Sequence, residues 1–256
     1  MIVDANAFLG KWPYWPVQGT RPEEIAAALD GLCVTQAAVC STRSVFVNWE
    51  DGNREVEAAA ERHPVFLPFA CLGTQELSHT WQPAEYDFAG YAKRGFRGLR
   101  LYPQHHSYHL LLESFVDTIL EDAAARAWPV VLPLRIIMNW GMPCLDLPVM
   151  QAIVMRHPRV RWILAGVNYL YELQMAVSLM NRYETVHLET SCIMGYSAIE
   201  KTVQRCGHER LLFGSGMPWQ EAAAGLSKIT HAQLSTAALE AVLGGNLLRL
   251  IRESAL

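Results

Sequence analysis

The stretch Met155-Arg-His-Pro-Arg-Val160 ends one predicted helix and begins the next predicted strand. The same junction recurs in Ala60-Glu-Arg-His-Pro-Val65 and in Ala125-Arg-Ala-Trp-Pro-Val130. Proline disfavours the helical conformation in the residue before it, and valine favours an extended strand. The recurrence of one helix-to-strand junction indicates a chain built from repeated strand and helix units.

Short apolar or β-branched runs alternate with helical stretches along the whole chain. We predict strands at 2–6, 36–41, 65–71, 95–102, 129–134, 160–166, 185–191 and 210–215. Amphipathic stretches that predict helices include 53–62, 114–126, 149–156 and 169–181, and the capping-box spacing of Thr20 and Glu23 predicts the start of an earlier helix. Such alternation implies parallel βαβ units, so we predict an α/β fold, a (β/α)8 TIM barrel that forms one domain over residues 1–256.

Composition favours a globular protein that binds small molecules. Hydrophobic residues make up 51% of the 256 residues, which is enough for one large core. The net charge of −4 is spread without long blocks, which argues against nucleic-acid and membrane-surface partners. No stretch reaches the roughly 18 apolar residues of a membrane helix, and the first residues lack the pattern of a signal peptide, so we expect a cytoplasmic protein. The cysteines form no CxxC pair, which is typical of reduced thiols.

The predicted loops richest in aromatic and polar residues follow the first, second, fourth and fifth strands, at 8–16, 42–51, 103–109 and 136–146. In a TIM barrel these loops lie at the carboxyl ends of the strands, where active sites are built. Their aromatic side chains can either line a pocket or pack the loops onto the barrel rim. These aromatic residues are Trp12, Tyr14, Trp15, Phe46, Trp49, Tyr108 and Trp140.

Several stretches match one protein family in their order along the chain. They are Ile2-Val-Asp-Ala-Asn-Ala-Phe8, Gly95-Phe-Arg-Gly-Leu-Arg-Leu-Tyr-Pro103, Pro129-Val-Val-Leu-Pro133, His157-Pro-Arg-Val-Arg-Trp-Ile-Leu-Ala-Gly166, Leu212-Phe-Gly-Ser-Gly-Met-Pro218 and Leu243-Gly-Gly-Asn-Leu-Leu-Arg-Leu250. Through them the chain resembles the amidohydrolase superfamily, in particular the branch that holds metal-dependent hydrolases, lactonases and aminocarboxymuconate-semialdehyde-type decarboxylases. The resemblance implies a TIM barrel with a metal-dependent site at the carboxyl ends of its strands.

The same resemblance places the family's metal ligands at Asn6, Phe8, Pro133, Gly166 and Gly216. Catalytic zinc takes histidine nitrogens and carboxylate oxygens. Four of these five residues have no side-chain donor atom, and the neutral amide of Asn6 is a poor ligand on its own. We therefore expect no metal and no other cofactor. A relocated metal site in the histidine-rich loop after the fourth strand stays an alternative, although adjacent histidines do not easily converge on one ion.

Candidates for proton transfer lie at the predicted mouth of the barrel. His105 and His106, with His109, follow the fourth strand, where a general acid or base would face the catalytic side. Glu189 lies in the seventh strand, and a carboxylate in an apolar barrel can exchange protons near neutral pH. Tyr102 is a further catalytic candidate. A serine nucleophile is not expected, because no Gly-x-Ser-x-Gly turn is present.

Two arginines predict how a substrate is held. Strand alternation points Arg100 and Arg135 toward the mouth, where a buried guanidinium needs Asp4, Glu189 or an anionic ligand as its partner. A guanidinium can form two parallel hydrogen bonds to one carboxylate, so the two arginines predict binding of a substrate carboxylate. The alternative is that they belong to an internal ion-pair network that replaces the positive charge of the metal. Further predicted substrate-binding residues are Asn168, Asn6, Ser191 and Ser215.

Two functions are compatible with this pattern. The first is a metal-free enzyme that acts on a small carboxylate by lactone or amide hydrolysis, or by a related proton-transfer or decarboxylation step. The second is a catalytically silent barrel that serves as a ligand-binding or partner-binding scaffold and fills its mouth with Phe8, Trp12 and Met217. We expect a small, anionic substrate as the partner, and a homo-oligomer that uses the apolar tail 247–256.

Overall fold

The structure is a computed structural model, and it describes residues 1–73, 86–137, 142–168 and 170–254. His79 lies outside these described residues. So do the predicted loop aromatic Trp140 and the first residue of the predicted helix 169–181.

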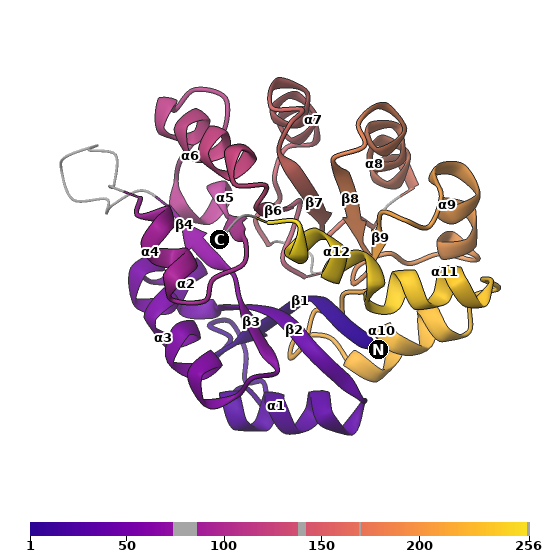
Figure 1. The fold of residues 1–256 in the computed structure, drawn as a ribbon, viewed down its shortest axis with the longest axis horizontal. Coiled ribbons are helices and arrows are strands. Elements are labelled where there is room, and N and C mark those ends of the chain that lie inside the picture. Colours follow the sequence, from indigo (N-terminus) through magenta and orange to yellow (C-terminus); the bar gives the residue numbers. More distant parts are fainter. Residues whose placement is uncertain (74–85, 138–141, 169, 255–256) are drawn as a thin grey trace.

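The strands form a TIM barrel, which confirms the predicted fold (Figure 1). They are β1 (Ile2–Leu9), β2 (Val34–Ser41), β3 (Phe66–Pro68), β4 (Ala70–Leu72), β5 (Leu99–Leu101), β6 (Pro129–Pro133), β7 (Arg161–Ala165), β8 (Val186–Glu189) and β9 (Leu211–Leu212). All ladders between them are parallel, in the orders β1-β2-β3 and β4 to β9. The ring closes where Ala5 N donates to Phe213 O over 2.8 Å and Gly216 N donates to Asn6 O over 2.8 Å.

The observed strands differ from the predicted ones by a few residues at most ends, and three of the differences have identifiable local reasons. The run 65–71 is interrupted at Phe69, whose amide still donates to Val39 O over 3.0 Å, so β3 and β4 together form the third barrel strand. The run 95–102 shortens to β5 because Gly95 turns with a positive φ of 91°. The run 210–215 shortens to β9 because its later residues, starting with Phe213, bond to β1 and to Val242.

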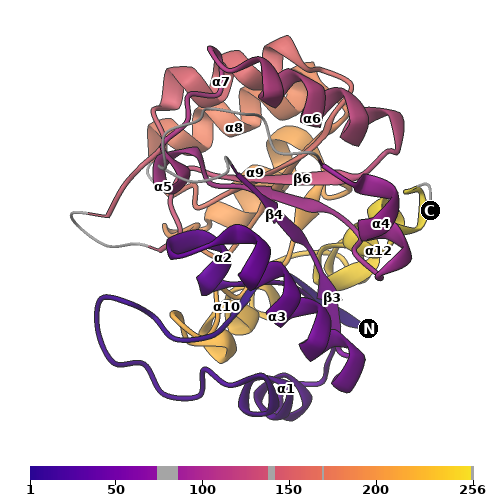
Figure 2. The same cartoon turned by 90° about the vertical axis from the view of Figure 1, so that its left-hand side faces the viewer.

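The helices surround the barrel (Figures 1 and 2). They are α1 (Pro22–Gly31), α2 (Thr42–Phe46), α3 (Trp49–Arg62), α4 (Phe88–Lys93), α5 (Pro103–His106), α6 (Ser114–Ala125), α7 (Leu147–Arg156), α8 (Leu170–Arg182), α9 (Ala198–Cys206), α10 (Ala222–Thr230), α11 (Thr236–Glu240), the π-helix η1 (Ala241–Gly245) and α12 (Asn246–Arg252). The predicted capping box is one residue off, because Arg21 is the N-cap of α1 and its amide donates to the Glu24 carboxylate over 3.1 Å.

The lower barrel interior is closed by the C-terminal helix. Leu247 and Leu250 of α12 join a buried cluster with Val3, Phe69 and Ile163. These two leucines are therefore buried inside the molecule, and a homo-oligomer that uses the tail 247–256 stays a prediction. Among the described residues, no helix is long and apolar enough to cross a membrane.

Candidate functional site

The five positions that the resemblance assigns to metal ligands lie at the carboxyl ends of their strands. Asn6 and Phe8 are buried on β1, and the Phe8 ring centroid lies 5.1 Å from the Arg100 guanidinium carbon. Gly166 and Gly216 have positive φ angles of 68° and 70°, so both follow their strands as turns. In the described part of the chain, no group of three or more histidine, cysteine, aspartate or glutamate side chains is arranged to hold a metal ion.

Arg100 lies at the centre of this region and is completely buried. Its Nη1 donates to Asn6 Oδ1 over 2.7 Å, and its Nη2 donates to Ala38 O over 2.8 Å. Longer contacts of 3.4 and 3.5 Å join Nη2 to the carbonyls of Ala7 and Ala5. The structure thus gives Arg100 an amide and backbone carbonyls as partners, where the sequence suggested a carboxylate.

Glu189 is completely buried and accepts hydrogen bonds from three protein donors. Its Oε1 accepts from Ser191 Oγ over 2.7 Å and from Gly166 N over 3.1 Å, and its Oε2 accepts from Ser191 N over 2.8 Å. Asn6 Nδ2 donates to Ser191 Oγ over 3.3 Å, so the amide of Asn6 links this carboxylate to Arg100. Four residues predicted to bind substrate or transfer protons therefore form one hydrogen-bonded chain, from Arg100 through Asn6 and Ser191 to Glu189.

Asp4 and Ser215 form a second buried pair. Asp4 Oδ1 accepts from Ser215 N over 3.0 Å and from Asn6 N over 2.9 Å, and Asp4 Oδ2 accepts from Ser215 Oγ over 2.5 Å. Burial raises the pKa of the Asp4 carboxyl, and the hydrogen bonds from Ser215 and Asn6 oppose that rise. Ser215 therefore binds a protein carboxylate.

Arg135 pairs with Glu172, a residue of α8 that the sequence reasoning missed. Arg135 Nη1 donates to Glu172 Oε2 over 2.7 Å and Nη2 to Oε1 over 2.5 Å, while Asn168 N donates to Glu172 Oε2 over 2.8 Å. The expected partners were Asp4, Glu189 or a ligand. Glu172 lies four residues after Asn168, in the first turn of α8. This position, just after a predicted strand end, was the sequence feature that could have identified Glu172 as a partner for Arg135.

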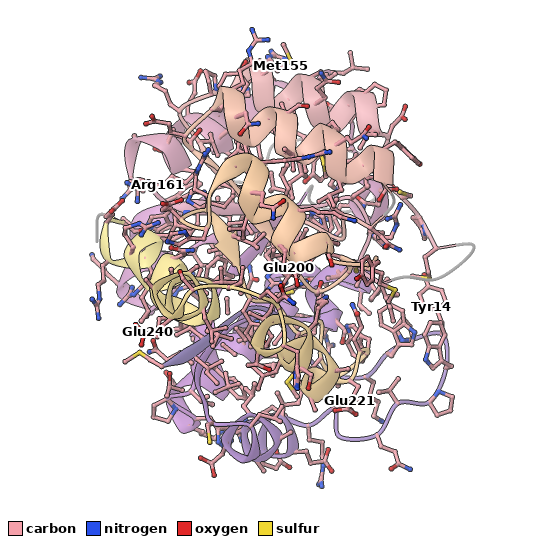
Figure 3. The ribbon with its side chains drawn as sticks, turned by 90° about the vertical axis from the view of Figure 1, so that its right-hand side faces the viewer. Tyr14, Met155, Arg161, Glu200, Glu221 and Glu240 are labelled. Carbon is pink, nitrogen blue, oxygen red and sulfur yellow. The ribbon has the colours of Figure 1, made fainter. Side chains whose placement is uncertain are left out.

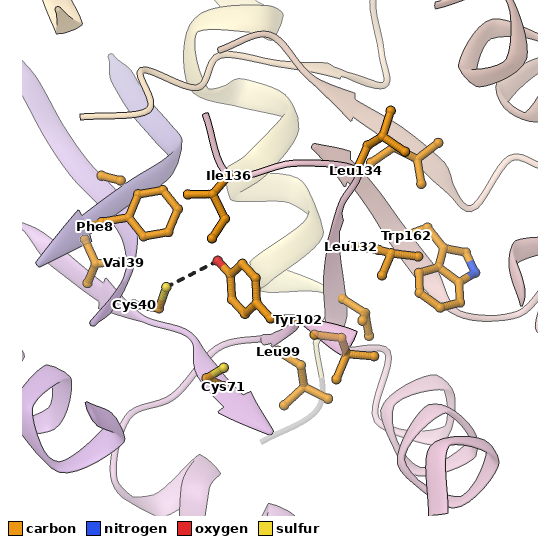
Figure 4. Close-up of a cluster of buried hydrophobic side chains, with 14 of the residues drawn as sticks. Phe8, Val39, Cys40, Cys71, Leu99, Tyr102, Leu132, Leu134, Ile136 and Trp162 are labelled. Carbon is orange, nitrogen blue, oxygen red and sulfur yellow. Dashed lines mark hydrogen bonds between the residues drawn. The ribbon is translucent and has the colours of Figure 1, made fainter. Parts of the chain in front are cut away.

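The histidine loop forms the short helix α5, and its members differ in environment. His106 Nε2 bonds to Ser44 O over 2.9 Å, and His109 is exposed. Both ring nitrogens of His105 are buried and have no hydrogen-bond partner within the described ranges. Tyr102 lies below them with its hydroxyl 3.5 Å from Cys40 Sγ, and burial raises the pKa of this phenol (Figure 4).

An aromatic cluster covers this end of the barrel. The Trp12 ring centroid lies 4.8 Å from that of Trp219 and 5.4 Å from that of Phe46, which in turn lies 5.1 Å from His105. Phe8, Trp12 and Met217, which the sequence named as able to fill the mouth, are all buried. Figure 4 shows Phe8 and Ile136 beside Tyr102 in the barrel interior. Trp219 is a member that the sequence reasoning missed.

The loop aromatics that the sequence grouped together differ in burial, and Phe46 among them is half-buried. Trp12, Trp49 and Tyr108 are buried, whereas Tyr14 and Trp15 are exposed. Figure 3 shows Tyr14 at the margin of the molecule, on the loop that follows β1. Tyr14 still contacts the cluster through Trp12, with 5.5 Å between ring centroids.

Comparisons with known proteins agree with this architecture. The family profile described as Amidohydrolase matches residues 12–252. A TIM-barrel protein from Bordetella bronchiseptica matches with a TM-score of 0.73 at 15% identity, covering 98% of both chains. The 2,6-dihydroxybenzoate decarboxylase from Rhizobium matches with a TM-score of 0.71 at 14% identity, covering 98% of both chains.

A third solved structure, the 5-carboxyvanillate decarboxylase from Sphingomonas paucimobilis, has a TM-score of 0.68 at 13% identity, with 98% of both chains covered. A search of curated proteins finds no match to the chain.

Proposed function

We propose, from the premise that the chain belongs to the amidohydrolase family, that its barrel mouth binds a small carboxylate and hydrolyses a lactone or amide bond in it without a metal ion. The family's metal chemistry does not fit the residues present. Of the five ligand positions, Asn6 alone has a side-chain atom that could coordinate a metal. That atom, Oδ1, already accepts a hydrogen bond from Arg100. Relatives that act on dihydroxybenzoate and carboxyvanillate support a small carboxylate as the substrate.

The observation that supports a ligand at the mouth is the state of His105. Both of its ring nitrogens are buried without a partner among the described residues, and a buried polar atom is normally hydrogen-bonded. Burial, with a smaller effect of the neighbouring His106, lowers the pKa of His105 to about 4. The imidazole is therefore neutral near pH 7 and offers one donor and one acceptor to a ligand.

Two indole groups supply further unused donors. Trp12 Nε1 and Trp219 Nε1 are both buried without a partner in the described part of the chain. Indole N–H groups donate only, so their ligand must present acceptors such as carboxylate or carbonyl oxygens. The rings of Trp12 and Phe46 offer flat apolar surfaces, which favours an aromatic or unsaturated body in the same ligand.

These groups suffice for hydrolysis in outline. Neutral His105 takes a proton from a water molecule as that water attacks the scissile carbonyl carbon, and the proton then passes to the leaving oxygen or nitrogen. The indole N–H groups hydrogen-bond the carbonyl oxygen that gains negative charge. Tyr102 and Ile136 exclude bulk water from below, because both are buried.

A second function, binding without turnover, is favoured by the barrel interior. Asp4 and Glu189 are completely buried and accept hydrogen bonds from protein donors, so neither is free to activate water. Arg135 is likewise engaged by Glu172. The same mouth would then bind a small carboxylate as a receptor site.

The test uses the full chain in EDTA with a panel of aromatic and unsaturated carboxylates and their lactones. Binding is followed by calorimetry and turnover by chromatography. We expect Trp12→Phe, which keeps the ring but removes the indole N–H, to weaken binding about tenfold. His105→Phe should abolish turnover, while His231→Gln, at an exposed histidine, should change neither. Binding without turnover would establish the receptor function, and activity that depends on added metal would refute the proposal.

A further inference from the structure

Arg100 joins three strands from inside the barrel. It extends from β5, and its guanidinium contacts Asn6 on β1 and the Ala38 carbonyl on β2. The side chain is completely buried, so its charge is stabilised by protein dipoles and by nearby acidic groups. Asp4 on β1 is the carboxylate that interacts with this charge.

We propose that Arg100 is the resident cation of this barrel and takes the structural and electrostatic place that the family gives to a metal. Two of the five ligand positions contact it directly, since Asn6 accepts its hydrogen bond and the Phe8 ring lies beneath its guanidinium. The inference deepens the proposed metal independence, and it concerns the barrel interior, below the ligand groups at the mouth.

The position of Asn6 shows how this cation organises its surroundings. Asn6 Oδ1 accepts from Arg100, so its Nδ2 is oriented toward Ser191 Oγ, which donates to Glu189. The surroundings are tightly packed, because a β-carbon at Gly214 would lie 2.1 Å from Glu189 Oε2 and 3.2 Å from Asn6 Cβ. Arg100 is thus a positioning residue that fixes Asn6 and, through it, Ser191.

The charges in the interior balance only when Arg100 is present. Asp4 and Glu189 are the buried carboxylates of this hydrogen-bonded region, and Lys228 on α10 is the other nearby cation. The third buried carboxylate, Glu172, is already paired with Arg135. Lys228 Nζ donates to the carbonyls of Thr190, Ser191 and Ile193, at the end of β8. Without Arg100, one ammonium group would remain for two buried carboxylates, and an uncompensated buried charge is strongly destabilising.

The decisive experiment is thermal unfolding of the full chain in EDTA and with millimolar Zn²⁺ or Mn²⁺. We expect the wild-type Tm to change by less than about 1 °C with either metal, because the folded protein has no site that binds the added ion. Arg100→Met should lower Tm by about 10 °C or more, and Arg100→Lys, which keeps the charge but loses the forked contacts, should lower it by less.

A double-mutant cycle separates the charge of Arg100 from its packing. Arg100→Met should cost less in an Asp4→Asn background than in the wild type, because the uncompensated carboxylate is gone. Phe69→Leu, which removes packing beside Arg100 without changing charge, should add to Asp4→Asn independently. If Arg100→Met does not fold, Arg100→Gln, which also removes the charge but keeps a side-chain amide, takes its place in the cycle.

Either of two results would overturn the inference: a Tm raised by several degrees on adding Zn²⁺ or Mn²⁺ to the wild type, or strict additivity of the Arg100 and Asp4 substitutions. Neither result depends on whether carboxylates bind near His105. If the proposed function is wrong, the carboxylate panel will show neither binding nor turnover, while the double-mutant cycle of Arg100 and Asp4 will still show coupling.

Discussion

The Arg135 guanidinium and the Glu172 carboxylate form a two-point ion pair, with distances of 2.7 Å from Nη1 to Oε2 and 2.5 Å from Nη2 to Oε1. The pair joins the segment after β6 to helix α8. Arg135 Nη1 also donates to Gly166 O over 3.0 Å, so the turn after β7 is held in the same cluster. The side chain of Glu172 is 1% exposed and that of Arg135 is 10% exposed. Solvent therefore screens this pair little.

Removing the charge of Glu172 should be costly. We expect Glu172→Gln to lower the free energy of unfolding by about 3–5 kcal/mol, because it leaves a buried guanidinium without its carboxylate. Glu57→Gln is the matched control, since its partner Arg94 is 39% exposed and such pairs contribute less than about 1 kcal/mol. Urea unfolding of both variants makes the comparison, and equal losses would show that burial of the Arg135 pair contributes nothing.

The sequence predicts the barrel well because repeated local patterns determine it. The junctions that end at Val65, Val130 and Val160 lead into β3, β6 and β7. The break at Phe69 could not be predicted, since it depends on hydrogen bonds to β2 that are distant in sequence.

The candidate site was harder to predict than the fold. Residue type and strand position identified Arg100, Glu189 and His105, but their partners are set by tertiary contacts. Arg100 bonds to backbone carbonyls, which no side-chain pattern encodes, and Glu172 reaches Arg135 from a different helix. Whether the named residues bind substrate stays a prediction.

Restoring a family ligand at Gly166 should not be tolerated. A β-carbon there would lie 2.1 Å from the Arg135 carbonyl oxygen, and the φ of 68° strains any other residue. We expect Gly166→Ala and Gly166→His to lose at least about 3 kcal/mol of stability or to fail to fold. Gly31→Ala, with nothing within 4 Å of the new β-carbon, should be nearly neutral. Soluble, stable Gly166→His protein would contradict the positive φ of Gly166 and its close approach to the Arg135 backbone.

Stability should fall in acid through two buried histidines. Burial lowers the pKa values of His105 and His187 to about 4, below their ordinary value near 6.5. Between these two values the unfolded chain binds more protons than the folded protein, so stability is full above about pH 6.5 and is lost as the pH falls toward about 4. Urea unfolding across that range should show a shallower slope for His187→Phe than for the wild type, and an unchanged slope for the exposed control His231→Gln. Equal slopes for all three proteins would show that His187 does not titrate with a lowered pKa.

Asn53 should be essential to the packing of α3 against the barrel. Its side chain is 2% exposed, its Oδ1 accepts from Cys71 N over 2.8 Å, and its Nδ2 donates to Cys71 O over 2.9 Å. It thereby pairs with the backbone of β4 as a neighbouring strand would.

Asn53→Ala leaves a buried N–H and a buried C=O without partners, which should lower the free energy of unfolding, measured in urea, by about 2–5 kcal/mol. Asn53→Asp should be at least as harmful, because a carboxylate cannot donate to the Cys71 carbonyl. Asn48→Ala, which removes the cap that accepts from Asp51 N at the half-buried start of the same helix, should cost only about 1 kcal/mol. An Asn53 variant no less stable than the Asn48 variant would show that α3 is held by its apolar face alone.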